Sequence, residues 1–227
     1  MRLYAITDRR LLPGTHESGR LSAAERDGLV KLAAEWAALG VEFVQLREKD
    51  LGVRELTELT QAMLAAMRDA GTGRPRLLIN AGAAGAAEAA RTAGAAGIHL
   101  PGRWRAEQVG MARIAGTVSV GCHSLGEIAV AAVSGADIAL LSPVFPTESH
   151  PEARPLGLDA LRAASQTAGK VPVFALGGVD ATNAASCIEA GAAGVAGIRT
   201  FLSGRWMANA ALDLGIGDSR IDPATAR

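Results

Sequence analysis

This chain of 227 residues has few cysteines, no formal net charge and few long apolar runs. Its two cysteines, Cys122 and Cys187, lie too far apart in the sequence to form a metal or redox motif, which fits a reducing compartment. Lys plus Arg and Asp plus Glu each number 23, so the formal net charge is zero. Proteins that bind nucleic acids or membrane surfaces usually show a basic face, so this balance argues against both classes.

No apolar run is long enough to span a membrane. The first residues, 1–8 (MRLYAITD), lack the long apolar region of a signal peptide. Apolar residues nevertheless make up 49% of the chain, which is enough for one large core. We therefore expect a cytoplasmic enzyme.

What the sequence does contain is a repeated order of strand, helix and glycine. Short apolar runs predict strands at 3–6, in the first part of 41–49, and at 76–79, 97–100, 117–120, 137–141, 171–175 and 194–197. Apolar residues at helical spacing predict helices at 22–39, 53–70, 83–93, 106–114, 124–133, 158–167 and 182–190, and a last one near Phe201. Glycine follows five of these helices, at Gly40, Gly71, Gly94, Gly135 and Gly191.

Eight such units in a chain of this length predict a single (β/α)8 barrel, that is, a TIM barrel. We place this domain at residues 1–215 and expect a flexible C-terminal tail at 216–227. A doubly wound open sheet is the structural alternative, although such a sheet rarely needs eight units.

The active site of a TIM barrel lies at the carboxyl ends of its strands. One strand ends in Gln45, Arg47 and Lys49, and the first two lie on the same face because they are two residues apart. An amide, a guanidinium and an ammonium gathered there suit a phosphate or carboxylate ligand. The alternative interpretation is a solvated run of charges after a strand.

Glycines at two neighbouring strand ends indicate a phosphate site. Bare backbone N–H groups can approach a phosphate closely at such turns. The residues that we assign to phosphate binding are Gly177, Gly178, Gly197, Ile198, Arg199 and Thr200. The alternative is that these glycines only make tight turns.

His123 is the best candidate for acid–base chemistry, because it follows a strand and an imidazole can both take and give a proton near neutral pH. A capping or surface histidine is the alternative.

His99 also ends a strand, but its apolar neighbours favour a buried, hydrogen-bonded ring. Cys122 adjoins the site without any sign of activation. No carboxylate cluster is visible at the strand ends, which argues against a metal site.

Taken together, these strand ends resemble the thiamine phosphate synthase/TenI superfamily over nearly the whole chain. The matching segments are 4–8 (YAITD), 44–49 (VQLREK), 78–80 (LIN), 97–100 (GIHL), 119–127 (SVGCHSLGE), 142–147 (SPVFPT), 155–157 (PLG) and 173–179 (VFALGGV). The resemblance implies substrate-binding roles for Gln45, Arg47, Lys49, Asn80, Thr147 and Ser149.

The synthase branch couples a pyrimidine diphosphate to a thiazole phosphate, releases diphosphate and needs magnesium. Its pattern has Asp after the third-strand Asn, whereas Ala81 follows Asn80 here. It also has an acidic ligand shortly after the fourth-strand histidine, where this chain has residues 101–104 (PGRW). Its phosphate loop ends in lysine, and His150 takes that place in 146–150 (PTESH).

The tautomerase branch aromatises a thiazole carboxylate phosphate by moving a proton, needs no metal and carries a histidine at the position of His123. The resemblance therefore implies a metal-independent thiazole tautomerase that uses no cofactor and takes a small phosphorylated thiazole. A magnesium-dependent synthase and a non-catalytic thiazole or thiamine phosphate binding protein remain alternatives. The resemblance is also compatible with a homodimer, and the long segment 142–157 is a candidate lid or binding loop.

Overall fold

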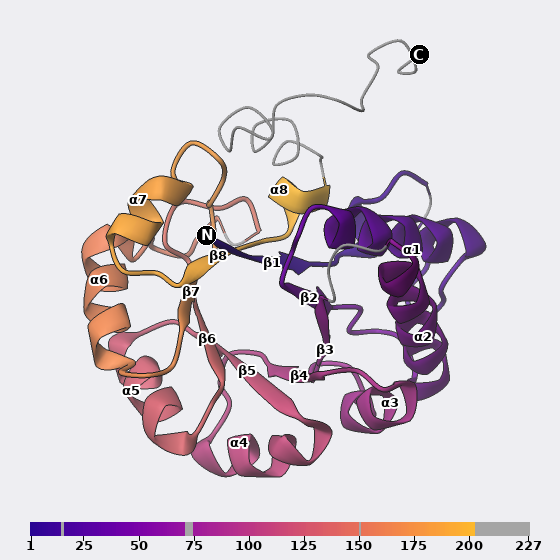
Figure 1. Cartoon of the computed structure of the whole chain (residues 1–227), viewed down its shortest axis with the longest axis horizontal. Coiled ribbons are helices and arrows are strands. Elements are labelled where there is room, and N and C mark those ends of the chain that lie inside the picture. Colours follow the sequence, from indigo (N-terminus) through magenta and orange to yellow (C-terminus); the bar gives the residue numbers. More distant parts are fainter. Residues whose placement is uncertain (15, 71–74, 150, 203–227) are drawn as a thin grey trace.

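A closed barrel of eight parallel strands forms the centre of the computed structural model, which describes residues 1–14, 16–70, 75–149 and 151–202 (Figure 1). The strands are β1 (Arg2–Ile6), β2 (Phe43–Leu46), β3 (Arg76–Asn80), β4 (Gly97–Leu100), β5 (Thr117–Cys122), β6 (Ile138–Leu141), β7 (Val173–Ala175) and β8 (Gly194–Gly197). Each strand pairs with its neighbours in sequence order, and β8 pairs with β1 to close the ring. The predicted TIM barrel is confirmed.

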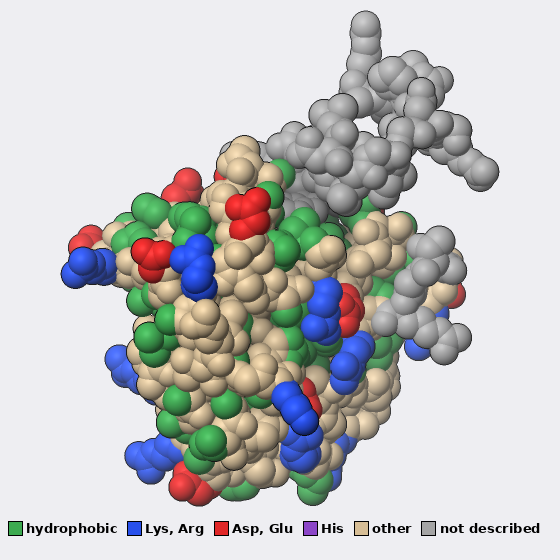
Figure 2. Space-filling model, turned by 60° about the vertical axis from the view of Figure 1, so that its left-hand side comes forward, with side chains coloured by type: hydrophobic (Ala, Val, Ile, Leu, Met, Phe, Trp, Pro, Cys, Tyr) green, Lys and Arg blue, Asp and Glu red, His purple; other side chains and the backbone are tan. Residues whose placement is uncertain are grey.

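Helices surround this barrel as an outer ring (Figure 1). They are α1 (Ala23–Ala38), α2 (Val53–Asp69), α3 (Ala86–Ala93), α4 (Ala106–Ala112), α5 (Leu125–Ser134), α6 (Gly157–Thr167), α7 (Ala184–Glu189) and α8 (Arg199–Leu202), with 3-10 turns η1 (Arg9–Leu11) and η2 (Arg113–Ala115). Within the described ranges, none of these helices combines the length and apolar character that crossing a bilayer requires. On the face turned forward in Figure 2, basic and acidic side chains are interspersed.

The apolar side chains form two separate cores, because alternate residues of each strand point to opposite faces. The larger core lies between strands and helices and includes Val44, Ile79 and Trp36. A smaller cluster fills the barrel interior, and its members are Tyr4, Ile6, Phe43, Leu78, Ile138, Leu140, Phe174 and Ala196. The apolar filling leaves the carboxyl ends of the strands free for polar side chains.

The predicted helix boundaries are confirmed where glycine or a cap fixes them. Gly94 and Gly135 take the left-handed conformation directly after α3 and α5. Ser22 and Glu25 form a capping box at the start of α1. The helix predicted from residue 83 instead begins at Ala86, because the chain turns first.

A second capping box, at Ser124 before α5, is only half formed. The Ser124 hydroxyl accepts the N–H of Glu127, but the Glu127 carboxylate accepts the N–H of His123. Gly71, His150 and the predicted tail at 216–227 lie outside the described residues.

Candidate active site

Polar side chains from four consecutive strands lie on the inner face of the barrel. Gln45, Asn80, His99 and Ser119 come from β2, β3, β4 and β5, and all four are buried. Asn80 is in register with His99, and His99 with Ser119. The inner layer is therefore one continuous polar surface near the barrel mouth.

The predicted ligand residues Gln45 and Asn80 hold each other in this layer. The Asn80 side-chain amide donates to the side-chain oxygen of Gln45 at 2.9 Å, and Asn80 Oδ1 accepts the backbone N–H of Gly82 at 2.8 Å. Gln45 Nε2 in turn donates to the hydroxyl of Tyr4 at 3.2 Å. These contacts fix the orientation of both amides.

The same chain of contacts continues to His99. The Tyr4 hydroxyl donates to Ser119 Oγ at 3.4 Å, and Ser119 Oγ lies 3.0 Å from His99 Nδ1. Burial raises the pKa of Tyr4 to about 12, so the phenol keeps its proton. Burial, followed by the positive charges of Arg47 and Lys49, lowers the pKa of His99 to about 3. His99 is thus the buried, hydrogen-bonded histidine that the sequence predicts, with a neutral ring.

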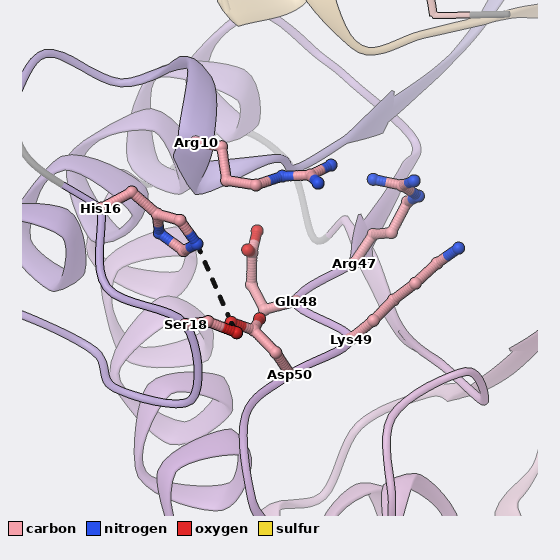
Figure 3. A pocket seen from close by; sticks show the side chains of 7 residues that line it. All are labelled: Arg10, His16, Ser18, Arg47, Glu48, Lys49 and Asp50. Carbon is pink, nitrogen blue, oxygen red and sulfur yellow. Dashed lines mark hydrogen bonds and ion pairs between the residues drawn. The ribbon is translucent and has the colours of Figure 1, made fainter.

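Three cationic side chains form a group beside this layer, namely Arg10, Arg47 and Lys49. Figure 3 shows the Arg10 guanidinium extending toward that of Arg47, with the Lys49 amine directed to the same side. Asp8 lies 2.6 Å from Arg10 and 3.2 Å from Arg47. Burial and the charges of Arg47 and Arg10 lower the pKa of Lys49. One carboxylate among three cations leaves an excess of positive charge, which suits an anionic ligand.

A buried ion network centred on Arg9 adjoins the cationic group through Glu48 and Asp50. The Arg9 guanidinium lies 2.7 Å from Asp50, 3.1 Å from Glu48 and 3.3 Å from Glu25. Hydrogen bonding to Arg9 lowers the pKa of Asp50, whereas burial raises that of Glu48 although Thr7 and Arg9 bind its carboxylate. A cavity of about 230 Å³, lined by Arg10, His16, Ser18, Arg47, Glu48, Lys49 and Asp50, opens beside this network (Figure 3).

His123 lies just beyond β5 and its ring is held by the neighbouring strand end. Its Nδ1 lies 2.7 Å from the backbone carbonyl oxygen of Ser142, which follows β6. Its Nε2 lies against Gly102, where a Cβ atom would come within 2.5 Å of it. A carbonyl oxygen only accepts hydrogen bonds, so Nδ1 carries the proton and Nε2 of the neutral ring carries the free lone pair.

The long segment after β6 is attached to the end of β7 at its start. The N–H groups of Val144 and Phe145 donate to the carbonyl groups of Leu176 and Gly177. The segment closes on itself where the N–H of Leu156 donates to Pro143 O. Its predicted ligand residues, Thr147 and Ser149, come from the middle part, which projects beyond these attachments.

The segment after β6 passes so close to the end of β7 that glycine is required at positions 177 and 178. Gly177 and Gly178 have φ angles of +89° and +65°. A Cβ atom at Gly177 would contact Pro143, and one at Gly178 would contact Pro146 O and Phe145. Tight packing therefore accounts for both glycines, and their role in phosphate binding stays a prediction.

The residues that follow β8, which were also assigned to phosphate binding from the sequence, contact the segments that follow β6 and β7. Arg199 Nη1 donates to Ser149 Oγ at 3.1 Å, and Arg199 Nε lies 3.4 Å from Glu148. The Thr200 hydroxyl donates to Val179 O at 2.9 Å. The remaining two residues of that prediction, Gly197 and Ile198, precede or begin the turn into α8. The structure thus brings the last three strand ends together.

The residues present do not fit a magnesium site of the synthase type. Magnesium takes oxygen ligands, chiefly carboxylates. Ala81 and residues 101–104 (PGRW) supply none, and the three carboxylates near the cationic group each contact an arginine. Across the described part of the chain, no three His, Cys, Asp or Glu side chains are grouped so that they could hold a metal.

Sequence reasoning missed two parts of this site. Tyr4 and Ser119 begin two of the segments that match the family, but no role was assigned to them, yet they link Gln45 to His99. The network of Arg9 was also missed, although the run from Glu48 to Asp50 already placed two carboxylates at a strand end. The period of two within each strand would have placed Ser119 on the inner face.

Comparison with known proteins gives consistent results. The sequence model of the family described as thiamine monophosphate synthase (TMP-TENI) matches residues 3–201. A Geobacter sulfurreducens protein, provisionally named a thiamine-phosphate synthase, is 39% identical over 207 residues, covering 88% of this chain and 86% of its own length. The thiamine-phosphate synthase of Thermus thermophilus is 31% identical over 206 residues, covering 88% and 89%.

Among solved structures, thiamine phosphate pyrophosphorylase from Pyrococcus furiosus has a TM-score of 0.72 at 24% identity, covering 95% of this chain and 97% of its own, which is a likeness of fold. The names of these relatives favour the synthase, which the sequence left as an alternative, over the tautomerase. Because the family model and the relatives span most of the described chain, this protein belongs to the thiamine monophosphate synthase/TenI family.

Proposed function

We propose that this enzyme of the thiamine phosphate synthase/TenI family binds a phosphorylated thiazole in the barrel mouth and moves a proton on it without a metal ion. The reaction is then that of a thiazole tautomerase acting on a thiazole carboxylate phosphate. The observation that carries this proposal is the contact of His123 Nδ1 with the carbonyl of Ser142, which leaves Nε2 as a base.

In the proposed reaction, Nε2 of neutral His123 accepts a proton from the substrate ring. The resulting imidazolium keeps its Nδ1–H on the Ser142 carbonyl, which stabilises the positive charge. The ring then returns the proton to a different substrate atom, so substrate and product are isomers and His123 ends neutral. No group leaves, and no charge has to be neutralised by a cation.

The remaining site residues would hold the two anionic ends of the substrate. Arg47, with Arg10 and Lys49, supplies positive charge for the carboxylate. The N–H groups of the glycine turns at 177–178 and 197–200, together with Thr147 and Ser149, suit the phosphate.

Thiamine phosphate synthase is the second candidate, and the names of the relatives favour it. That reaction releases diphosphate, whose charge normally needs a metal partner. The residues at both positions of the synthase metal pattern, Ala81 and 101–104, are not acidic. For this reason we place the tautomerase first.

Two assays decide between these functions. Tautomerisation of thiazole carboxylate phosphate and release of diphosphate from the two synthase substrates are each measured with magnesium and with EDTA. We expect tautomerisation in both conditions and no diphosphate. Diphosphate release that requires magnesium would establish the synthase instead.

The variant His123→Ala tests the assigned base. We expect at least a hundredfold loss of turnover, within the range of about 10²–10⁴ that general acid–base catalysis contributes, while thiazole phosphate still binds. An unchanged rate would show that His123 is not the base. Binding without turnover in the wild-type protein would establish the non-catalytic alternative.

A further inference from the structure

The hydrogen-bond chain from Gly82 to His99 has a fixed direction. It starts at the backbone N–H of Gly82, which can only donate, so the Asn80 atom that faces it is the acceptor Oδ1. The other end of that amide, Nδ2, must therefore donate to Gln45 Oε1. The amide of Gln45 is oriented in the same way, with Nε2 donating to the Tyr4 hydroxyl.

The direction is transmitted through the two hydroxyl groups. Tyr4 already accepts from Gln45, and its single proton points to Ser119 Oγ. Ser119 accepts from Tyr4, and its own proton then faces His99 Nδ1 at 3.0 Å. If His99 Nδ1 instead carried a proton and donated it to Ser119 Oγ, the hydroxyl proton of Ser119 would have no acceptor among the hydrogen bonds of the described residues. Nδ1 is therefore the acceptor, and the ring proton of His99 is on Nε2.

Nε2 of His99 lies beside Gly121, near the carboxyl end of β5. A Cβ atom at Gly121 would lie 3.5 Å from this nitrogen and 3.3 Å from the backbone nitrogen of Gly102. None of the hydrogen bonds among the described residues uses this nitrogen. His123 Nε2 lies against the same Gly102. The two histidines thus present opposite groups near one glycine, a donor from His99 and an acceptor from His123.

We propose that His99 is a neutral hydrogen-bond donor that binds a carboxylate oxygen of the substrate through Nε2–H and so determines specificity for the carboxylated thiazole. The identity of the ligand in this inference rests on the proposed function. The tautomer of His99 rests only on the hydrogen bonds described above. Near neutral pH the ring holds no second proton, so it can donate without acting as an acid. Lys49 and Arg47, whose charges reach His99, add attraction for the same carboxylate.

The tautomer is tested directly by ¹⁵N NMR of the ligand-free protein between pH 5 and 8. We expect His99 to carry its proton on Nε2 and His123 on Nδ1, and we expect no titration of His99 in this range. A proton on His99 Nδ1, or protonation of this ring near pH 6.5, would overturn the inference.

Ser119→Ala removes the hydroxyl whose proton faces His99 Nδ1. Nδ1 then lacks its donor, so we expect the Nδ1–H tautomer of His99 to appear. Thr60→Val is the matched control, because it removes a buried hydroxyl on α2 that has no hydrogen-bond partner among the described residues and lies outside this chain of contacts. An unchanged tautomer in Ser119→Ala would contradict the proposed direction.

Calorimetric titration with thiazole carboxylate phosphate and with thiazole phosphate tests the ligand. We expect the wild-type protein to prefer the carboxylated compound by roughly tenfold to a hundredfold, the value of one hydrogen bond to a charged group. Ser119→Ala and His99→Phe should reduce this preference, with thermal melts confirming that they fold. An unaltered preference in both would overturn the contact between His99 and carboxylate. Failure to bind either compound would overturn the proposed function and the assigned ligand, while the tautomer measurement would still stand as a separate result.

Discussion

Arg9 binds the Asp50 carboxylate with both terminal nitrogens, at 2.7 and 2.9 Å, and its side chain is fully buried. The contact joins the turn after β1 to the segment after β2. The carboxylate partner, Asp50, lines the same cavity as Arg10, Arg47 and Lys49 (Figure 3). The buried pair therefore supports the backbone that carries the proposed anion-binding side chains.

Replacing Arg9 by methionine should destabilise the protein strongly. The change leaves Glu25, Glu48 and Asp50 without their shared cation, and breaking such a buried pair costs about 3–5 kcal/mol. Urea unfolding measures this loss. Arg162→Ala, which removes an exposed pair with Asp159, is the control and should cost less than about 1 kcal/mol. Equal costs for the two variants would contradict the structural role of Arg9.

Asp50 should make the protein less stable in acid. Hydrogen bonding to Arg9 lowers its pKa in the folded state, so its contribution is complete above the unfolded value of about 3.9 and is lost as the pH falls below it. Glu48 acts in the opposite direction, because burial raises its pKa. Comparing wild type with Asp50→Asn isolates the effect of Asp50. The melting temperature of the variant should fall less between pH 6 and pH 3, and an equal fall in both would refute this assignment.

Thr60→Val should stabilise the protein. The Thr60 hydroxyl is buried in α2 without a hydrogen-bond partner among the residues that the structure describes, and valine fills the same volume without a hydroxyl. An unpaired buried polar group costs about 1–3 kcal/mol, so we expect a gain of about 1 kcal/mol in urea unfolding. Thr60→Ser keeps the hydroxyl, removes the methyl group and should destabilise. A loss of stability in Thr60→Val would reveal an unnoticed partner of the hydroxyl.

Gly178→Ala should disturb the segment after β6. Both Gly178 and Gly157 have positive φ angles, for which alanine costs about 1–2 kcal/mol, but a Cβ atom at Gly178 also meets Pro146 O and Phe145, whereas Gly157 has open space. We expect the cost at Gly178 to exceed that at Gly157 by more than about 1 kcal/mol, since overpacking adds to the strain. We also expect weaker binding of thiazole phosphate, measured by calorimetry, in Gly178→Ala alone. Similar results for both glycines would mean that strain, not contact, governs the turn.

Arg47→Gln should weaken the binding of thiazole carboxylate phosphate. It removes one of three cations beside Asp8, and the loss of a charged hydrogen bond is worth about 1.5–3 kcal/mol. Calorimetry at low and high salt measures the effect, which should shrink as salt screens the charge. Arg20→Gln, an exposed arginine paired with Glu17, is the control. A dissociation constant unaffected by Arg47→Gln would exclude this side chain from the site.

The barrel was predictable because its signals are local. Glycines such as Gly94 and Gly135 mark the helix ends, and apolar runs mark the strands. Strand order follows from the eightfold repeat. The ends of short helices were less accurate, as at Ala86, because turns before a helix have no strong sequence pattern.

The site was predictable only where charged or glycine residues stand at a strand end. Arg47 and Lys49 were found in this way, and the structure places both beside the inner polar layer. Ser119 and Tyr4 were missed, since their importance depends on neighbours that are 115 residues apart in the sequence. Arg9 was missed for the same reason, because two separate segments, at Glu25 and at Glu48–Asp50, supply its ion-pair partners.

The inner hydrogen-bond chain lies entirely on β1 to β5, whereas the long segment and the glycine turns belong to β6, β7 and β8. The two halves of the barrel thus carry separable tasks, and the contact of His123 with Ser142 joins them. If the proposed function holds, recombination that exchanged the second half between relatives would alter the proposed phosphate contacts and leave the orientation of His99 intact. Under that proposal, the phosphate end and the carboxylate end of the substrate are recognised by parts of the barrel that can be exchanged separately.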